Sequence, residues 1–199
     1  MAVLAPAHPA AVAPAQRDQT IVPLRALPIL GIVLAGLIAA IASDGGWALD
    51  FFHVVGGGLW TAVDLFVGLV LGPIMRSMPP PARIELARRL MPKLLLLMPT
   101  LVTMTLGSGF QLARHLGNLS ASYPQHDLLV ASYAVVGVMT VIALGLLSPS
   151  NLAVLFEMRK PEPNPARIGR LMRVFVYTAG ITGVMQVATL VIMTKLAAG

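Results

Sequence analysis

The sequence predicts an all-α fold, a polytopic transmembrane helix bundle of about five spans. Of the 199 residues, 57% are hydrophobic and only 11% are charged, whereas soluble globular domains carry about 25% charged residues. The mean hydropathy is +0.82, and apolar stretches long enough to cross a hydrocarbon core of about 30 Å recur along the chain. We therefore expect a single transmembrane domain over residues 23–199, after a flexible tail over residues 1–22 that is rich in Ala and Pro.

The five spans are expected at residues 26–43, 51–75, 94–113, 128–147 and 174–194. The first is uncharged and begins far from Met1, which favours a retained helix over a cleaved signal peptide. Proline disfavours helix at the preceding residue, so the second span is expected to end near Gly72-Pro73 and the fourth at a break over residues 148–151, before a short continuation to Met158. Pro99 predicts a kink within the third span.

Charge distribution predicts the orientation. Of the 14 Lys and Arg residues, 12 lie before the first span and in the loops 76–93 and 159–173. By the positive-inside rule these segments, with the N-terminus, are expected on the cytoplasmic side of an inner membrane. Residues 82–90 alternate apolar and basic side chains, which predicts a short amphipathic helix on the membrane surface. The stretch 44–50 is expected to be a short acidic loop on the outer side.

Several classes of function are excluded by what the sequence lacks. The chain has no cysteine, so disulfides, thiolate ligands and iron–sulfur clusters are ruled out, and any metal must be held by His, Met, Asp or Glu. Basic residues are not interleaved with aromatic ones in a patch, so a nucleic-acid partner is not expected. The chain contains no phosphate-binding loop, GxSxG or HExxH motif.

One face of the second span carries polar groups. His53, Gly57, Trp60 and Asp64 follow one another at helical spacing, and Asp64 lies roughly 16 Å deeper than His53. An ionisable residue at this depth is expensive in lipid and is by default a functional residue facing the protein interior. We expect Asp64 to relay a proton or bind a cationic group. The alternative is a neutral acid that is hydrogen-bonded to a Thr, Ser or Tyr of a neighbouring helix.

Three histidines are expected at one level of the membrane. His53 follows the outer loop, His115 ends the third span and His126 precedes the fourth. Two imidazoles from facing helices suffice as axial ligands of b-type haem, and they also suit copper or zinc. We take His53 and His115 as the axial pair, with Trp60 as a further cofactor-binding residue and His126 as a further metal ligand. Solvated loop positions are the alternative for His115 and His126.

Small residues beside these histidines leave two alternatives open. Gly56, Gly57 and Gly58 on the second span, like Gly107 and Gly109 on the third, suit either a flat macrocycle or a neighbouring helix. Gln111 and Gln186 are expected to form hydrogen bonds between helices.

The second and third spans carry a resemblance to a known superfamily. The pattern comprises a histidine and a tryptophan separated by six residues, followed by a basic loop and a span with small and polar residues: His53, Trp60, Arg88-Arg89-Leu90, Lys93, Pro99, Thr103 and Gly107. It resembles the CopD-like copper-resistance membrane proteins and is similar to the HemJ-type protoporphyrinogen oxidases. The HemJ-type resemblance implies a b-type haem on His53 and a functional lysine at Lys93, and the CopD-like resemblance implies copper binding by His53.

The leading functional expectation is a b-type haem protein that serves electron transfer or porphyrin oxidation, with Asp64 handling a proton. If it is an enzyme, we expect a membrane oxidoreductase. One alternative is passage of copper or another cation along His53 and Asp64, and another is an accessory subunit of a larger respiratory-type membrane complex. The expected partners are the lipid bilayer and either such a complex or further copies of the chain.

Overall fold

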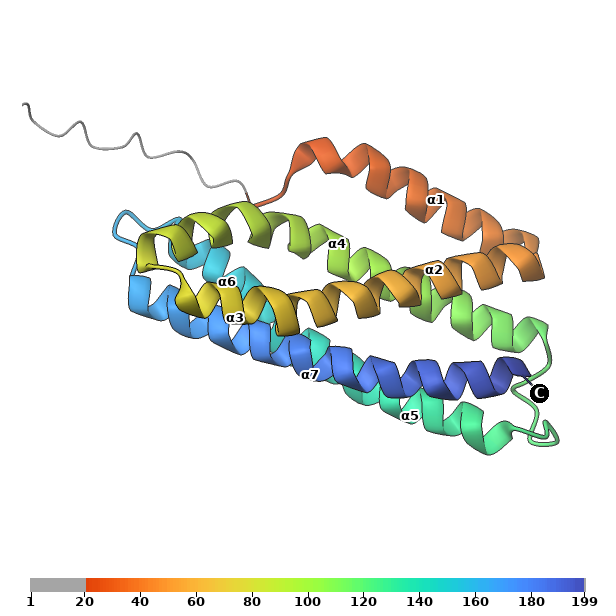
Figure 1. Ribbon diagram of the computed structural model, residues 1–199. Coiled ribbons are helices and arrows are strands. Elements are labelled where there is room, and N and C mark those ends of the chain that lie inside the picture. Colours follow the sequence, from red (N-terminus) through yellow and green to blue (C-terminus); the bar gives the residue numbers. More distant parts are fainter. Residues whose placement is uncertain (1–20, 199) are drawn as a thin grey trace, which may run out of the picture.

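The computed structural model describes residues 21–198, which form a bundle of long helices (Figure 1). Residues 21–198 contain no strand, and five helical runs are long and apolar enough to cross a membrane: Leu24–Ser43, Gly46–Ser77, Pro80–His115, His126–Met158 and Pro165–Ala198. The all-α class is confirmed, and the runs are compatible with a multi-pass membrane protein. Apart from Ile21 and Val22, the expected tail lies outside the described residues.

The elements in chain order are η1 (Leu24–Ala26), α1 (Leu27–Ser43), α2 (Gly46–Leu65), η2 (Phe66–Leu71), α3 (Gly72–Ser77), α4 (Pro80–His115), α5 (His126–Ile142), η3 (Ala143–Leu147), α6 (Ser148–Met158) and α7 (Pro165–Ala198). The segments η2 and η3 are π-helical. The end of the bundle where α3 meets α4 and α6 meets α7 is called the basic end (Figure 1). The opposite end, with the α1–α2 turn and the α4–α5 loop, is called the histidine end.

The helices begin earlier than the sequence indicates. The expected acidic loop over residues 44–50 is only a turn, because Asp44 adopts a left-handed conformation with φ 49° and α2 begins at Gly46. Residues 82–90 are the opening turns of α4 and not a separate surface helix. Prolines at the first positions of α4 and α7 explain these early starts, because a missing N–H costs nothing in the first turn.

Two prolines that were expected to end spans do not end them. A π turn precedes each one: the N–H of Gly72 bonds to the carbonyl of Val67, and the N–H of Ser148 bonds to that of Ala143. In an α-helix a proline loses one hydrogen bond and its ring clashes with the carbonyl four residues back. The wider π turn relieves that clash, so both spans continue to the basic end.

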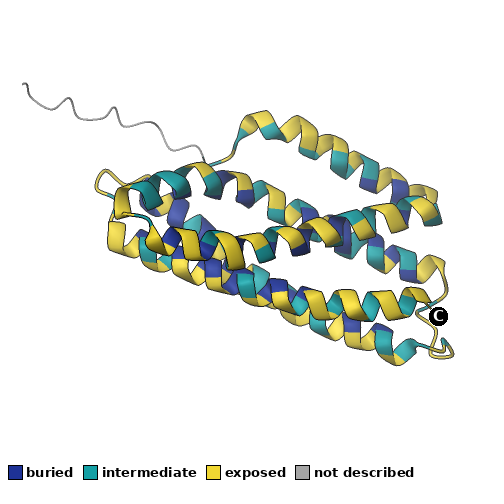
Figure 2. Ribbon diagram, viewed as in Figure 1, coloured by how far each residue is buried: buried dark blue, intermediate teal, exposed yellow. Residues whose placement is uncertain are grey.

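The core lies along the inward faces of the helices (Figure 2). At the basic end it is apolar, with Met91, Leu155 and Met172 among its fully buried side chains. Toward the histidine end, Trp60, Leu101, Met104 and Met139 form a second apolar cluster. Glycines bring the α2–η2 segment against α7, since a Cβ on Gly183 would lie 3.0 Å from the backbone nitrogen of Leu65.

Candidate site around Asp64

Asp64 is buried in the interior of the bundle, with 1% of its surface exposed. Two side chains of α7 donate to its Oδ2 atom: the hydroxyl of Thr182 at 3.0 Å and the amide nitrogen of Gln186 at 2.9 Å. The ion pairs found within residues 21–198 do not involve Asp64. Its partners are therefore neutral, and Gln186 acts between helices as expected.

The glycines of η2 and α7 bring Thr182 and Gln186 within hydrogen-bonding distance of Asp64. Gly68 follows Asp64 by one turn, and a Cβ on Gly180 would lie 3.3 Å from the Cα of Gly68. Small residues are the usual means by which membrane helices approach at backbone distance. With the backbones this close, the short Thr182 side chain is long enough to reach the Asp64 carboxyl.

Thr182 has one hydroxyl hydrogen and three acceptors in range. The carbonyl oxygens of Thr178 and Ala179 lie 3.1 and 3.0 Å from its Oγ1 atom, and the Oδ2 atom of Asp64 lies 3.0 Å away. A hydroxyl donates once and accepts up to twice. An ionised Asp64 needs that hydrogen, whereas a protonated Asp64 can donate to Thr182 and leave the hydrogen to the backbone. The hydrogen bonds thus accommodate both protonation states without moving a helix.

A spare acceptor lies beside the carboxyl. The Oε1 atom of Gln186 is buried and has no hydrogen-bond partner among the described residues. Buried polar atoms are rarely left unpaired, so such an atom marks a position for a proton donor, a water molecule or a cation. The Asp64 region therefore offers oxygen atoms that a positive charge can use.

His53 packs against α4 and away from Asp64. Its Nδ1 atom lies 2.9 Å from the carbonyl oxygen of Thr105, and its ring occupies the space over Gly109. A Cβ on Gly56 would lie 2.9 Å from the Thr105 hydroxyl oxygen. At Gly56 and Gly109 the structure shows the neighbouring helix, whereas a Cβ on Gly58 would have no neighbour within 4 Å.

The other two histidines lie elsewhere at the histidine end. The Nδ1 atom of His115 lies 3.2 Å from Asp44 Oδ2, and Gln111 donates to Asp44 Oδ1 at 3.0 Å. These hydrogen bonds, that of His115 first, hold the pKa of Asp44 below its usual value. His126 begins α5, where its Nδ1 atom is buried and has no hydrogen-bond partner within residues 21–198. The contacts of His115 thus fasten the α1–α2 turn to the end of α4.

The expected metal set of His53, His115 and His126 is not assembled by residues 21–198. His53 and His115 contact different partners, and within this range no three His, Asp or Glu side chains are grouped as a metal site. Lys93 is separated by twelve residues of α4, about 18 Å, from the Thr105 turn that contacts His53, so one small site does not contain both.

A pocket of about 400 Å³ lies between α4 and the α5–η3–α6 helix, with Trp60 of α2 in its wall. Its lining is mostly apolar and includes Asn151, which is 3% exposed and whose Oδ1 atom has no hydrogen-bond partner in the described part of the chain. None of the three histidines above lines it. Trp60, which lies one turn from Asp64, therefore lines this pocket. Asn151 lines it too, although the sequence around Asn151 predicted only a helix break.

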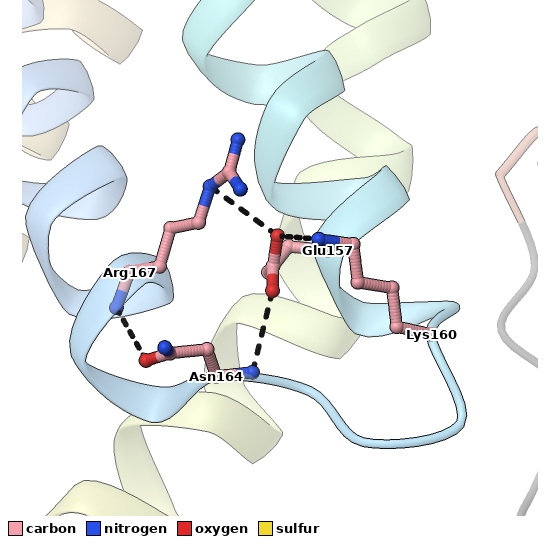
Figure 3. Close-up of polar contacts among 4 residues, drawn as sticks. All are labelled: Glu157, Lys160, Asn164 and Arg167. Carbon is pink, nitrogen blue, oxygen red and sulfur yellow. Dashed lines mark hydrogen bonds and ion pairs between the residues drawn. The ribbon is translucent and has the colours of Figure 1, made fainter.

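Glu157 is a buried acid that the sequence did not single out (Figure 3). Its carboxylate lies 2.8 Å from Lys160 Nζ and 3.3 Å from Arg167 Nε, and the backbone N–H of Asn164 donates to it at 3.4 Å. The Asn164 side chain in turn accepts from the N–H of Arg167 at 3.1 Å. This network closes the α6–α7 loop, and every member lies within ten residues of Glu157. We therefore assign Glu157 a structural role in this loop.

No family model matches the chain, and no curated protein or solved structure is significantly similar to it. The resemblance to CopD-like and HemJ-type proteins stays a prediction.

Proposed function

We propose that the chain is a polytopic membrane protein that passes a proton or another small cation within the bilayer, with Asp64 as the exchanging group. The observation that carries this proposal is the position of Asp64: a buried carboxyl in the bundle, with neutral partners and a spare acceptor beside it. A carboxyl that serves only to join two helices needs no such acceptor. The Thr182 hydroxyl can satisfy the carboxyl in either protonation state.

Polar residues on the inner faces favour access from the histidine end. Ser108, Thr105 and Gln111 of α4 are buried, and so is Thr61 of α2, one turn from Asp64. The hydroxyls of Thr61 and Thr105 donate to their own helix, so their oxygen lone pairs remain available to a cation. Toward the basic end, an apolar core cluster lies beside the buried polar residues Asn151 and Glu157, and Glu157 is already paired with Lys160 and Arg167. We therefore propose that the cation enters and leaves at the histidine end.

Charge counting supports the orientation within this proposal. With the basic end cytoplasmic, as the positive-inside rule requires, the histidine end faces outward from an inner membrane. His53 then lies on the route between the outer surface and Asp64. Copper is one cation that this route suits, because an imidazole and a carboxylate are both ligands of that metal.

The test is ion flux into liposomes that contain the full chain. A membrane potential is imposed, proton entry is followed with a trapped pH dye, and copper entry is followed in parallel with a trapped copper-chelating dye. Asp64→Asn is expected to abolish the flux while keeping the volume of the side chain. Asp50→Asn is the matched control, because the same change is made at an exposed residue of α2. Equal flux in the parent and Asp64→Asn, or no flux above empty liposomes in the parent, would overturn the proposal.

Haem-dependent electron transfer or porphyrin oxidation is the rival function, and a reduced-minus-oxidised spectrum tests it directly. An α-band in the parent that disappears in His53→Ala would replace cation passage as the function. An accessory role in a larger complex rests on α1, since only 11% of the most apolar window of its span is buried in the bundle. Co-purification of stoichiometric partner subunits from native membranes would support that role.

A further inference from the structure

A second pocket, of about 380 Å³, lies at the basic end between α3, α4 and α7. Its lining includes Arg76, Arg83, Gly169, Arg173 and Tyr177. Three helices each contribute one arginine, and the lining contains no carboxylate. The pocket therefore carries a formal charge of about +3.

The three guanidinium groups are placed by different contacts. Arg83 donates from Nε to the carbonyl of Met75 and from Nη2 to that of Met78, each at 3.0 Å, which fixes its head at the end of α3. Arg76 lies over the ring of Tyr177, 5.4 Å from the ring centre. Arg173 is exposed and lies one turn before Tyr177 on the same helix.

Gly169 leaves space beside one of these guanidinium groups. A Cβ on Gly169 would lie 3.8 Å from Nη1 of Arg83, so even a short side chain would contact the arginine that Gly169 faces. Glu157, the buried acid at this end, pairs with Lys160 and Arg167 and not with the pocket arginines. Like charges that converge without an acid repel one another, and an anion between them removes that cost.

We propose that this pocket binds a phosphate group at the basic end of the bundle. Guanidinium groups match phosphate oxygens with paired N–H donors, and the Tyr177 hydroxyl adds a neutral donor. Basic pockets between transmembrane helices are typical sites for anionic lipid headgroups. A lipid phosphodiester and a soluble phosphate share this chemistry. The site is independent of Asp64 and goes beyond the proposed function.

The experiment measures the thermal midpoint of the delipidated full chain in neutral detergent. Three probes are titrated: dioctanoyl phosphatidylglycerol, dioctanoyl phosphatidylcholine and inorganic phosphate. Arg173→Gln removes a pocket charge that makes no hydrogen bond within the described structure. Arg170→Gln is the matched control, since it removes the same charge from an exposed residue of α7 outside the pocket. Each midpoint shift is compared with the unliganded midpoint of the same variant, so a change in folding stability does not confound it.

Phosphatidylglycerol is expected to raise the midpoint more than phosphatidylcholine does. The concentration for half of the shift is expected to rise about fivefold in Arg173→Gln, and by much less in Arg170→Gln. A shift with phosphatidylglycerol alone identifies a lipid headgroup as the ligand, and an equal shift with inorganic phosphate identifies a soluble one. Equal weakening by both substitutions would assign the effect to diffuse surface charge and overturn the proposal, as would the absence of a shift with every probe.

Discussion

Gly68 of η2 and Gly180 of α7 meet backbone to backbone, and a Cβ on Gly68 would overlap the Cα of Gly180. The contact lies one turn from Asp64, on the side of the basic end. It sets the spacing between α2 and α7 at which Thr182 and Gln186 reach the buried carboxyl. The geometry of the candidate site thus depends on two residues that contribute no side chain to it.

Gly68→Ala is expected to destabilise the bundle by about 1–3 kcal/mol, because overpacking forces the helices apart. Gly180→Ala is expected to cost less, since its Cβ would lie 3.3 Å from the Cα of Gly68 and a small shift relieves that contact. The control is Gly58→Ala, where the added methyl would have no neighbour within 4 Å. Thermal midpoints in one detergent check the order, and a Gly68→Ala midpoint equal to that of Gly58→Ala would contradict the tight contact.

Thr182→Val is expected to cost about 1 kcal/mol, because the buried carboxyl of Asp64 loses a hydrogen-bond partner at nearly constant side-chain volume. This corresponds to a fall of about 2–4 °C in the thermal midpoint. Thr194→Val is the control, since Thr194 is exposed on the same helix and bonds only to the carbonyl of Val191, at 2.9 Å. If the two variants melt together, the bond between Thr182 and Asp64 does not contribute to stability.

The α1–α2 turn is expected to open in acid. The hydrogen bonds from His115 and then Gln111, with the nearby positive charge of Arg114, hold the pKa of Asp44 below its usual value. A carboxyl whose pKa is lower in the folded state stabilises that state above the unfolded pKa of about 3.9, and this contribution is lost as the pH falls through the folded pKa. Opening is therefore expected only below about pH 3.9.

Emission from Trp47, which lies three residues from Asp44 and is 80% exposed, can report this opening in an acid titration. Asp44→Asn is expected to remove the transition, because the variant has no carboxyl to protonate. A transition near neutral pH in the parent, or the same acid transition in Asp44→Asn, would show that another group controls the turn.

Glu157→Gln is expected to loosen the α6–α7 loop, because the neutral amide weakens the attraction to Lys160 and Arg167. Limited trypsin digestion should then cut after Arg159 faster than in the parent, whereas the bond after Lys160 resists trypsin because Pro161 follows it. Glu162→Gln serves as the control, because it removes the same charge from an exposed residue of the same loop. Unchanged cleavage in Glu157→Gln would mean that the loop is held by other contacts.

The five spans could be predicted from the sequence because they depend on local composition. The ends of the spans could not be predicted as well. Pro73 and Pro149 indicated helix breaks, and no residue type in the sequence predicts the π turns that precede them. Helical spacing placed His53 and Asp64 on one face of α2. The structure shows that α4 covers this face at His53 and α7 covers it at Asp64.

Contacts between helices that are far apart in the chain could not be predicted from the sequence. Thr182 follows Asp64 by 118 residues, and their meeting depends on the glycine contact between η2 and α7. A Thr, Ser or Tyr partner was an expected alternative for Asp64, but nothing local distinguishes Thr182 from the other threonines of its helix. The sequence predicted that the arginines of the basic-end pocket lie on the cytoplasmic side. That these arginines line one pocket could be learned only from the structure.

The π turn in η2 also leaves the rotational phase of one helix unchanged. A π turn holds one residue more than an α turn, and each residue of an α-helix rotates the chain by about 100°. Asp64 precedes η2 and Arg76 follows it. Deleting one residue from Phe66–Leu71 would therefore leave an α turn that completes the same rotation, so Asp64 and Arg76 would keep their faces. Deleting one residue from the α-helical part between Asp64 and Arg76 would instead rotate the two halves by about 100°, so that either the carboxyl leaves Thr182 or the guanidinium leaves its pocket.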